Sequence, residues 1–422
     1  MLIEFKVSNY RSIKDEVVLS LQSTSAQNDL PLSTFQIGKS GINLAKTTAI
    51  YGANGSGKSN IWNALLTMWQ LVSTSFGDIQ GDSLKGRIVP FLLSDLTSDK
   101  PSVFEVTFAI DDLIYRYGFT ADNKSILEEH LDQVGPSSVK NVFVSTAGEL
   151  TVGNSFRKSI KNIDVWKAST RKNNALYLSS GATVNVEIPL KVFNWFASLG
   201  IVKATSNEPY EQYTQSQFNE IGKEKILKLI KSADISIDDI LRNDTTISAS
   251  QVPEQLRGLF GVKDGVEEIN GFNFVSVHKK YNKKGLESGS VNFDFFSAES
   301  DGTIKIFNLA GPIIDSLENG KILFVDEFES RLHPLLLESL VKLFNGPLNT
   351  KNAQLIFCVH NTILLQNKTV RRDQIWFTDK DKFGATRLYS LADFKPRKDD
   401  SLEKKYLNGI FGAIPYIEDL EL

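Results

Sequence analysis

The residues with the clearest chemical meaning form one run, Gly52–Ser59, which reads G-A-N-G-S-G-K-S. A β-prone segment, 47–51, precedes this run, and a segment with helical apolar spacing, 60–66, follows it. A strand, a glycine-rich turn and a helix start in this order are typical of a phosphate-binding loop, in which backbone N–H groups surround an anion. We therefore predict a nucleoside triphosphate site made by Gly52, Asn54, Gly55, Ser56, Gly57, Lys58, Ser59 and Asn60.

The last two residues of the run have separate expected roles. Lys58 would reach the β- and γ-phosphates, and the hydroxyl of Ser59 would bind Mg²⁺. The glycines let the backbone turn tightly and direct its N–H groups inward. The expected cofactors are therefore ATP and Mg²⁺.

Two carboxylates follow a continuous apolar segment, 322–325, and a histidine follows another, 354–359. Such apolar segments are expected of parallel strands that are buried on both faces, and α/β sheets present their catalytic groups where strands end. Asp326 would hold Mg²⁺ through water, and Glu327 would polarise the water that attacks the γ-phosphate. His360 would face the γ-phosphate from the neighbouring strand.

A second candidate anion site lies at 296–303, which reads F-S-A-E-S-D-G-T and opens a predicted helix. Ser297, Ser300 and Gly302 could present hydroxyl and N–H groups to a phosphate at the positive end of the helix dipole. By itself this pattern indicates only a well-capped helix. It gains weight because a phosphate-binding loop needs a second element to close over the nucleotide.

Arg11 lies in a turn between two predicted strands near the N-terminus. A solvated arginine and a phosphate contact are equally compatible with this position. We include Arg11 among the candidate nucleotide-binding residues.

Composition limits the class of protein. The chain has 422 residues, 41% of them hydrophobic and 23% charged, with a formal net charge of −3. These values are typical of a soluble globular protein and give no global case for nucleic-acid binding. The single cysteine excludes an internal disulfide framework. We find no signal segment and no apolar run of membrane-spanning length, so we expect a cytoplasmic protein without a membrane partner.

The whole set of motifs resembles the ABC-type ATPases of the SMC/RecF/OLD group. Within that group the chain is most similar to bacterial AAA family ATPases of the abortive-infection, anti-phage kind (AbiL-like and RloA-like). The resemblance rests on the Walker A loop, the E-S-D-G-T signature at 299–303, the V-D-E strand end, R-L-H-P at 331–334 and the strand-end His360. Further matching segments are 352–357, 371–377 and 406–415, whereas 150–270 matches poorly.

The resemblance implies an α/β fold: a P-loop NTPase with an ABC-type ATPase head, an antiparallel β lobe and a largely helical insertion. We expect an N-terminal ATPase lobe with Walker A and a β subdomain at 1–156, and a mainly helical insertion at 157–270. A C-terminal ATPase lobe with the signature, Walker B and the histidine switch is expected at 271–422. Lysines 223, 225, 228 and 231 in the insertion are interpreted as a solvated helix face.

The resemblance also implies an ATP-hydrolysing enzyme that assembles as an ATP-sandwich homodimer, or a higher oligomer, with each signature closing the partner's nucleotide. Its expected role is a sensor or scaffold in anti-phage defence. It would control a separate effector encoded nearby, such as a TOPRIM-type nuclease, and respond to DNA or a phage protein. The alternative is a RecF/SMC-like DNA-repair ATPase that acts directly on DNA. Net charge and the lack of a sustained heptad repeat argue against this alternative.

Overall fold

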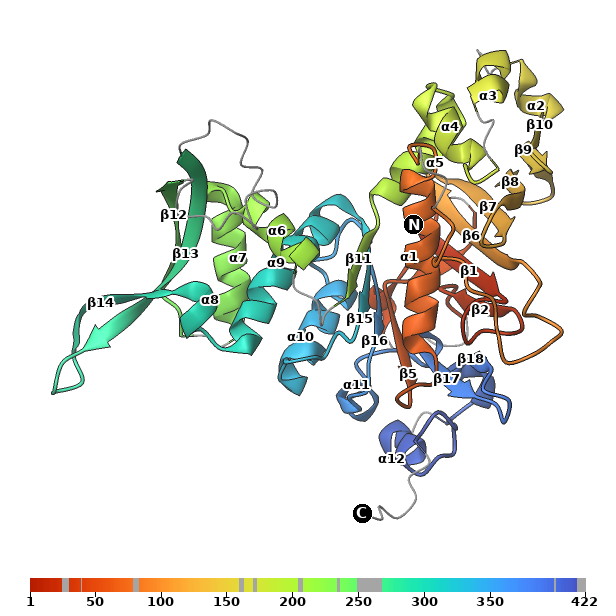
Figure 1. Ribbon diagram of the computed structural model, residues 1–422. Helices are drawn as coiled ribbons and strands as arrows, with labels where there is room; N and C mark the ends of the chain where they lie inside the picture. Colours follow the sequence, from red (N-terminus) through yellow and green to blue (C-terminus); the bar gives the residue numbers. More distant parts are fainter. Residues whose placement is uncertain are drawn as a thin grey trace. The chain divides into compact units, whose positions relative to one another are not determined.

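The computed structural model describes residues 1–24, 30–38, 40–78, 83–158, 163–169, 173–203, 208–233, 236–248, 268–397 and 400–415. The chain forms two compact units (Figure 1). The first unit comprises Met1–Thr205, Asp315–Ser330 and Leu337–Leu422, and the second comprises Ser206–Ile314 and Arg331–Leu336.

A mainly parallel six-stranded sheet lies at the centre of the first unit. Its order is β11 (Gly200–Lys203), β15 (Ile322–Asp326), β16 (Gln354–Cys358), β5 (Thr47–Gly52), β17 (Ile375–Lys380) and β18 (Thr386–Ser390). All neighbouring pairs are parallel except β17 and β18. Every residue of β5, β15 and β16 is buried, which explains their continuous apolar sequences. The predicted adjacency of β15 and β16 is confirmed by their parallel register.

The first unit also contains a seven-stranded antiparallel sheet. Its order is β10 (Glu149–Val152), β9 (Val139–Thr146), β8 (Ile126–Val134), β7 (Leu113–Ala121), β6 (Ser102–Ile110), β1 (Leu2–Ser8) and β2 (Val17–Ser20). A tight hairpin turn joins β6 and β7, and its residues Asp111 and Asp112 have φ angles of 49° and 64°. Two consecutive positive φ angles match the twist of the flanking strands.

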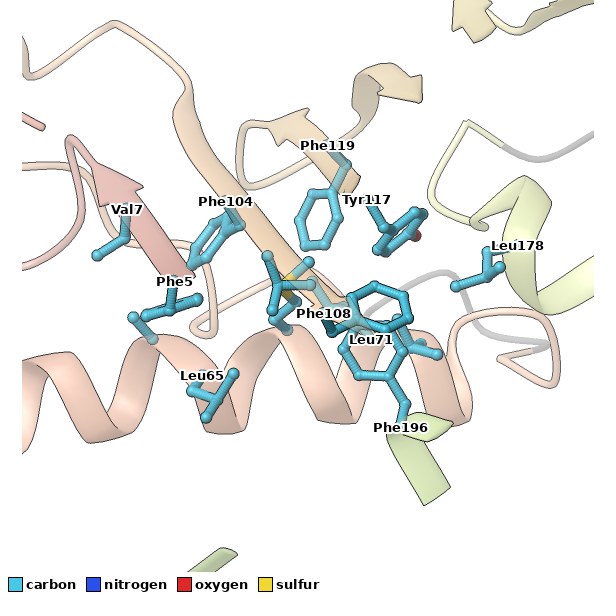
Figure 2. Close-up of a cluster of buried hydrophobic side chains, with 14 of the residues drawn as sticks. Phe5, Val7, Leu65, Leu71, Phe104, Phe108, Tyr117, Phe119, Leu178 and Phe196 are labelled. Carbon is cyan, nitrogen blue, oxygen red and sulfur yellow. The ribbon is translucent and has the colours of Figure 1, made fainter. Parts of the chain in front are cut away.

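Helix α1 (Lys58–Thr74) packs its apolar side chains against this antiparallel sheet (Figure 2). Leu65 and Leu71 of α1 meet Phe104 and Phe108 of β6 in one buried cluster. Helices α4 (Tyr177–Thr183) and α5 (Glu187–Ala197) complete the cluster with Leu178, Phe196 and neighbouring side chains. This core therefore holds the helix that begins at Lys58 against both sheets.

Smaller elements complete the first unit. They are η1 (Pro31–Ser33), β3 (Thr34–Gln36), β4 (Asn43–Ala45), α2 (Asn154–Arg157), α3 (Ile163–Ser169), α11 (Ile363–Gln366), η4 (Arg372–Gln374), η5 (Leu391–Phe394) and α12 (Leu402–Leu407). Helix α10 (Pro334–Asn345) begins in the second unit and continues into the first. In the described residues, no helix combines the length and the apolarity that crossing a membrane requires.

The second unit combines helices with a three-stranded antiparallel sheet. The sheet has the order β12 (Asp239–Ser248), β13 (Glu268–Tyr281) and β14 (Glu287–Asp294). The helices are α6 (Glu208–Gln217), α7 (Glu220–Ser232), α8 (Phe295–Ala298) and the first part of α9 (Asp301–Asn319). Phe218, Phe274 and Phe307 pack edge-on or tilted at the centre of this unit.

These two units differ from the three-part division expected from the sequence. Strand β11, inside the expected insertion 157–270, pairs with β15 and extends the parallel sheet of the first unit. Helices α4 and α5 lie in the core of that unit because their apolar faces cover the antiparallel sheet. The helical character of 157–270 therefore does not mark a separate body, and the second unit includes strands as well as helices.

Candidate active site

The loop between β5 and α1 contains glycines with positive φ angles, a conformation that other residues rarely adopt. A Cβ at Gly57 would lie 2.1 Å from Thr386 Oγ1, and Gly57 has a φ of 112°. Gly55 has a φ of 78° and is exposed. No side chain caps the start of α1, so its first N–H groups remain available to an external acceptor. This geometry fits the predicted phosphate site.

Lys58 lies inside this loop. Its side chain is 6% exposed, and Nζ donates hydrogen bonds to the carbonyl oxygens of Gly52 at 2.7 Å and Ala53 at 3.0 Å. Burial lowers the pKa of Lys58, because a desolvated ammonium is less stable. A buried ammonium with only carbonyl acceptors is well suited to an added anion, which would favour its charged form.

Side-chain hydroxyls from distant parts of the chain fix the outside of the loop. Ser56 Oγ is bonded to Thr378 Oγ1 at 2.6 Å, and Thr386 Oγ1 donates to the Ser56 carbonyl at 3.0 Å. Ser12 Oγ is bonded to Thr386 Oγ1 at 2.7 Å and accepts from Asn60 Nδ2 at 2.6 Å. Two predicted nucleotide-binding side chains, Ser56 and Asn60, are thus engaged in holding the loop, while Asn54 is exposed.

Asp326, at the end of β15, is fully buried. Neither of its carboxylate oxygens has a hydrogen-bond partner within the part of the chain that is described. The thiol of Cys358 lies near this carboxylate. Burial raises the pKa of Cys358, and the charge of Asp326 raises it further. An unpartnered buried carboxylate costs free energy unless a cation or donor satisfies it.

Glu327 directly follows β15 and His360 follows β16, and these two strands are parallel neighbours, as predicted. Glu327 is half-buried and has a φ of 54°, an uncommon conformation for glutamate. His360 is exposed, yet desolvation lowers its pKa and the charge of Lys58 lowers it further. A contact with the backbone of Gly52 has the opposite effect and raises this pKa, so the histidine ring lies beside the loop.

Glu329 is a site residue that the sequence reasoning did not assign. Its Oε1 accepts a hydrogen bond from the backbone N–H of His360 at 2.6 Å, and its Oε2 is buried without a partner. Burial raises the pKa of Glu329, which Lys58 opposes and Glu327 reinforces. Glu329 therefore joins the segment after β15 to the end of β16.

The ends of β5, β15 and β16 together form one charged centre. The carboxylates of Asp326, Glu327 and Glu329 all act to raise the pKa of Lys58. These strands are parallel neighbours, so their carboxyl ends meet at one edge of the sheet. The structure thus brings together the predicted phosphate loop, both acids and the histidine.

The turn that contains Arg11 is connected to α1 through the neighbouring residue Ser12. Arg11 has a φ of 51° and its Nε is buried without a partner. The adjacent Ser12 is bonded to Asn60 of α1, as described above. The turn that contains Arg11 is therefore fastened to the first turn of the helix that follows the loop.

The predicted signature residues belong to the second unit. Ser300 Oγ accepts from the backbone N–H of Thr303 at 3.2 Å and caps α9, and Ser297 Oγ donates to Asp294 at 2.7 Å. Gly302 lies close to Arg331: a Cβ at Gly302 would be 3.0 Å from the carbonyl oxygen of Arg331. The segment is thus an ordered, largely exposed helix start.

Glu299, inside the signature, has contacts that sequence reasoning missed. Glu299 Oε1 accepts from Ser276 Oγ at 2.5 Å and is bonded to His278 Nε2 at 2.7 Å. Both partners come from β13, more than 20 residues earlier in the chain. We call Ser276, His278 and Glu299 the Glu299 cluster.

The residues present fit Mg²⁺. Asp326 offers two unpartnered buried oxygens, and Ser59 lies at the start of α1. No cluster of three or more His, Cys, Asp or Glu side chains suited to a metal occurs in the described ranges. Mg²⁺ in nucleotide sites binds one or two protein oxygens together with phosphates and water, so Ser59 and Asp326 would suffice as protein ligands.

Comparisons with solved structures find several SMC heads. The SMC head domain from Thermotoga maritima has 13% identity and a TM-score of 0.40, covering 92% of this chain and 98% of that chain. The SMC head bound to the C-winged helix domain of ScpA has 14% identity and a TM-score of 0.41, covering 92% and 97%. The Smc head domain with an extended coiled coil, bound to the C-terminal domain of ScpA derived from Pyrococcus furiosus, has 13% identity and a TM-score of 0.40, covering 97% and 99%.

No curated protein matches the sequence. The observed topology, with its parallel sheet, phosphate loop and antiparallel lobe, is the predicted α/β P-loop NTPase fold of the ABC type. The family model described as "AAA domain, putative AbiEii toxin, Type IV TA system" matches residues 47–366. Since this match covers more than half of the chain, the protein belongs to that family of AAA-type ATPases.

Proposed function

We propose that this protein hydrolyses ATP and that its ATP-dependent self-association controls a separate effector in anti-phage defence. The observation that carries the ATPase assignment is the convergence of Lys58, Asp326, Glu327 and His360 at neighbouring strand ends. This combination supplies a phosphate cradle, a cation ligand, a base and a polar contact for the γ-phosphate.

Phosphate binding is assigned to the loop and α1. The uncapped N–H groups at the start of α1 hold the phosphate oxygens, and Lys58 exchanges its carbonyl contacts for phosphate. The bonds between Ser56, Thr378 and Thr386 keep the loop in place during this exchange. When bound, Mg²⁺ neutralises charge on the phosphates, and it would be held by Ser59 and Asp326.

Water activation is assigned to Glu327. Its position directly after Asp326, with positive φ, turns its side chain out of the strand register. A carboxylate there accepts a proton from, or polarises, the attacking water. His360, held through its backbone N–H by Glu329, contacts the γ-phosphate and senses its presence. Arg11 is a further candidate for a phosphate contact.

Closure of the site is assigned to a second copy of the chain. Ser297, Ser300 and Gly302 present an exposed helix start, which is suited to an anion outside its own unit. In a two-fold dimer each signature would close the nucleotide of the other chain. Hydrolysis then removes the bridging γ-phosphate and loosens the interface, so the ATP state acts as a switch.

The defence role is supported by the family to which the chain belongs, whose description names a toxin of a type IV TA system. An ATP-dependent switch could hold such a toxic activity in check and release it after infection. The effector is proposed to be a separate protein, TOPRIM-nuclease-like, and the trigger to be DNA or a phage protein.

The test of the ATPase assignment compares three proteins in a phosphate-release assay. Glu327→Gln should keep its affinity for ATP and lose about 10²–10⁴-fold in turnover, because the amide keeps the shape and loses the base. Glu128→Gln, an exposed glutamate of β8, is the matched control and should retain wild-type turnover. Wild-type turnover in Glu327→Gln would show that the base lies elsewhere, and no turnover in the wild type with any nucleotide would refute the ATPase.

A further inference from the structure

The hairpin formed by β13 and β14 has an unusual charge distribution for its unit. Residues 278–287 contain Lys279, Lys280, Lys283 and Lys284 but one acid, Glu287. The rest of β14 carries neutral residues until Asp294. The hairpin extends beyond the helices of its own unit (Figure 1). Positive charge is therefore concentrated on a projecting ribbon.

Most of this charge is free to bind a partner. Lys279 pairs with Glu287 across the hairpin at 3.0 Å. Within the described residues, no ion pair involves Lys280, Lys283 or Lys284, and all residues from 281 to 290 are exposed. Tyr281, between the two lysine pairs, is 59% exposed.

The loop at the end of the hairpin is ordered by its own hydrogen bonds. Asn282 Oδ1 accepts from the backbone N–H groups of Lys284 at 2.8 Å and Leu286 at 3.1 Å. The backbone N–H of Asn282 donates to Leu286 O at 2.8 Å, and Gly285 has a φ of 75°. The lysines are thus presented on a preformed turn, which reduces the entropy lost on binding.

Charge and shape together favour duplex DNA as the partner. Lysines neutralise phosphates and release counterions, and an exposed tyrosine among them can contact sugar or base. A two-stranded ribbon fits the major groove of B-DNA, whereas the major groove of an RNA duplex is too narrow for it. Helix α7 carries four lysines, as the hairpin does. These lysines lie on a helix and not on a ribbon, and Lys223 is paired with Asp239.

The base of the same hairpin contacts the predicted signature. His278 and Ser276 hold Glu299, and Lys280 is two residues beyond His278 on β13. Glu299 directly precedes Ser300, the cap of α9. A displacement of β13 would therefore be transmitted through two short hydrogen bonds to the start of α9.

We propose that the β13–β14 hairpin binds double-stranded DNA through Lys280, Lys283 and Lys284, and that the Glu299 cluster couples this binding to the signature. The binding step stands by itself. The coupling step rests on the proposed function, since it requires the signature to act in ATP turnover. In that setting, DNA is the trigger and Glu299 is a positioning residue.

The binding step is tested with full-length protein and a short fluorescent DNA duplex over a range of salt concentrations. Changing Lys280, Lys283 and Lys284 to Gln together should weaken binding roughly tenfold or more and reduce the salt slope by about 0.9 per lost phosphate contact. Changing Lys225, Lys228 and Lys231 of α7 to Gln removes the same charge and should leave both values near wild type. No duplex binding by the wild type, or equal losses in both variants, would overturn the proposal. Tighter binding of single strands or RNA would also reject the groove assignment.

The coupling step is tested by phosphate release with and without the same duplex. The duplex should change the turnover of the wild type. Glu299→Gln and Ser276→Ala should bind the duplex like the wild type, but their turnover should not change when the duplex is added. If both variants respond to the duplex as the wild type does, the coupling is wrong while the binding step is unaffected. A protein without turnover would refute the proposed ATPase, and the binding measurements would still decide the role of the hairpin.

Discussion

The nucleotide loop of the first unit and the signature segment of the second are both helix starts, but they are built differently. Around the loop, Ser56, Gly57 and Lys58 are buried, and hydroxyls from β17, β18 and the Arg11 turn hold it. In the signature, Ser297 and Ser300 are exposed, and within the described ranges their hydroxyls bond to near neighbours. A buried, braced site can bind an anion by itself, whereas an exposed helix start can contribute to a site on another molecule. The difference predicts which variants should fail in binding and which in turnover.

The largest effect is expected at Lys58. Lys58→Ala should reduce ATP affinity by roughly 100-fold or more, because it removes the buried cation that faces the β- and γ-phosphates. The fold should be retained, since burial already disfavours the charged form. Titration with a fluorescent ATP analogue measures the affinity, and circular dichroism checks the fold. Unchanged affinity would contradict the assignment of the loop.

The second prediction concerns the signature. Ser300→Arg should leave ATP binding to a single chain largely intact and abolish turnover, because the large cation occupies the exposed helix start. Mixing Ser300→Arg with Lys58→Ala should restore part of the turnover, since one composite site of the mixed dimer keeps both functional halves. Phosphate release by the mixture is the measurement. Mixed dimers that form and stay inactive would show that the signature does not act in trans.

Local patterns predicted the segments of the site better than the long-range contacts that hold them. The glycine loop, the apolar strands and the terminal acids are encoded within short segments, and the parallel register then places His360 beside them. Ser12 and Thr386 are 374 positions apart, so no local pattern could indicate their hydrogen bond. The contacts of Glu329 and Glu299 were missed for the same reason. Strand β11 was missed because four residues among helices give too weak a periodic signal.

The third prediction concerns the first unit and the dependence of its stability on pH. Glu129 is buried on β8 and accepts hydrogen bonds from Tyr117 Oη and the backbone N–H groups of Tyr177 and Leu178. Burial raises the pKa of Glu129 to about 7 in the folded state, above the value of 4.5 for an exposed glutamate. Between these values the folded chain keeps a proton that the unfolded chain has lost, so stability falls as pH rises.

The expected loss is roughly 1–3 kcal/mol between pH 5 and pH 8, which corresponds to several degrees in Tm. Glu129→Gln cannot ionise and keeps one of the two acceptor oxygens, so it should flatten this dependence. Thermal unfolding of both proteins across this pH range is the measurement. Parallel pH profiles would show that Glu129 is ionised in the folded protein throughout.

The smallest effect is expected at Glu329, one of the last residues of the first unit before the chain enters the second at Arg331. Two roles can be distinguished there, because Glu329 is both a hydrogen-bond acceptor for His360 N and a negative charge near Lys58. Glu329→Gln keeps the acceptor and should change turnover by less than about threefold. Its ATP affinity should rise slightly, since one carboxylate facing the triphosphate is removed.

Glu329→Ala removes the acceptor that holds the backbone N–H of His360 and should lower turnover by about tenfold, because His360 is then less well positioned. Steady-state kinetics of the two variants therefore separate positioning from charge. Equal losses in both would mean that the carboxylate charge itself takes part in turnover, and Glu329 would then join Glu327 as a candidate base. No loss in either would mean that the parallel neighbours of β16 are enough to hold its end in place. The nucleotide site of the first unit would then not depend on Glu329.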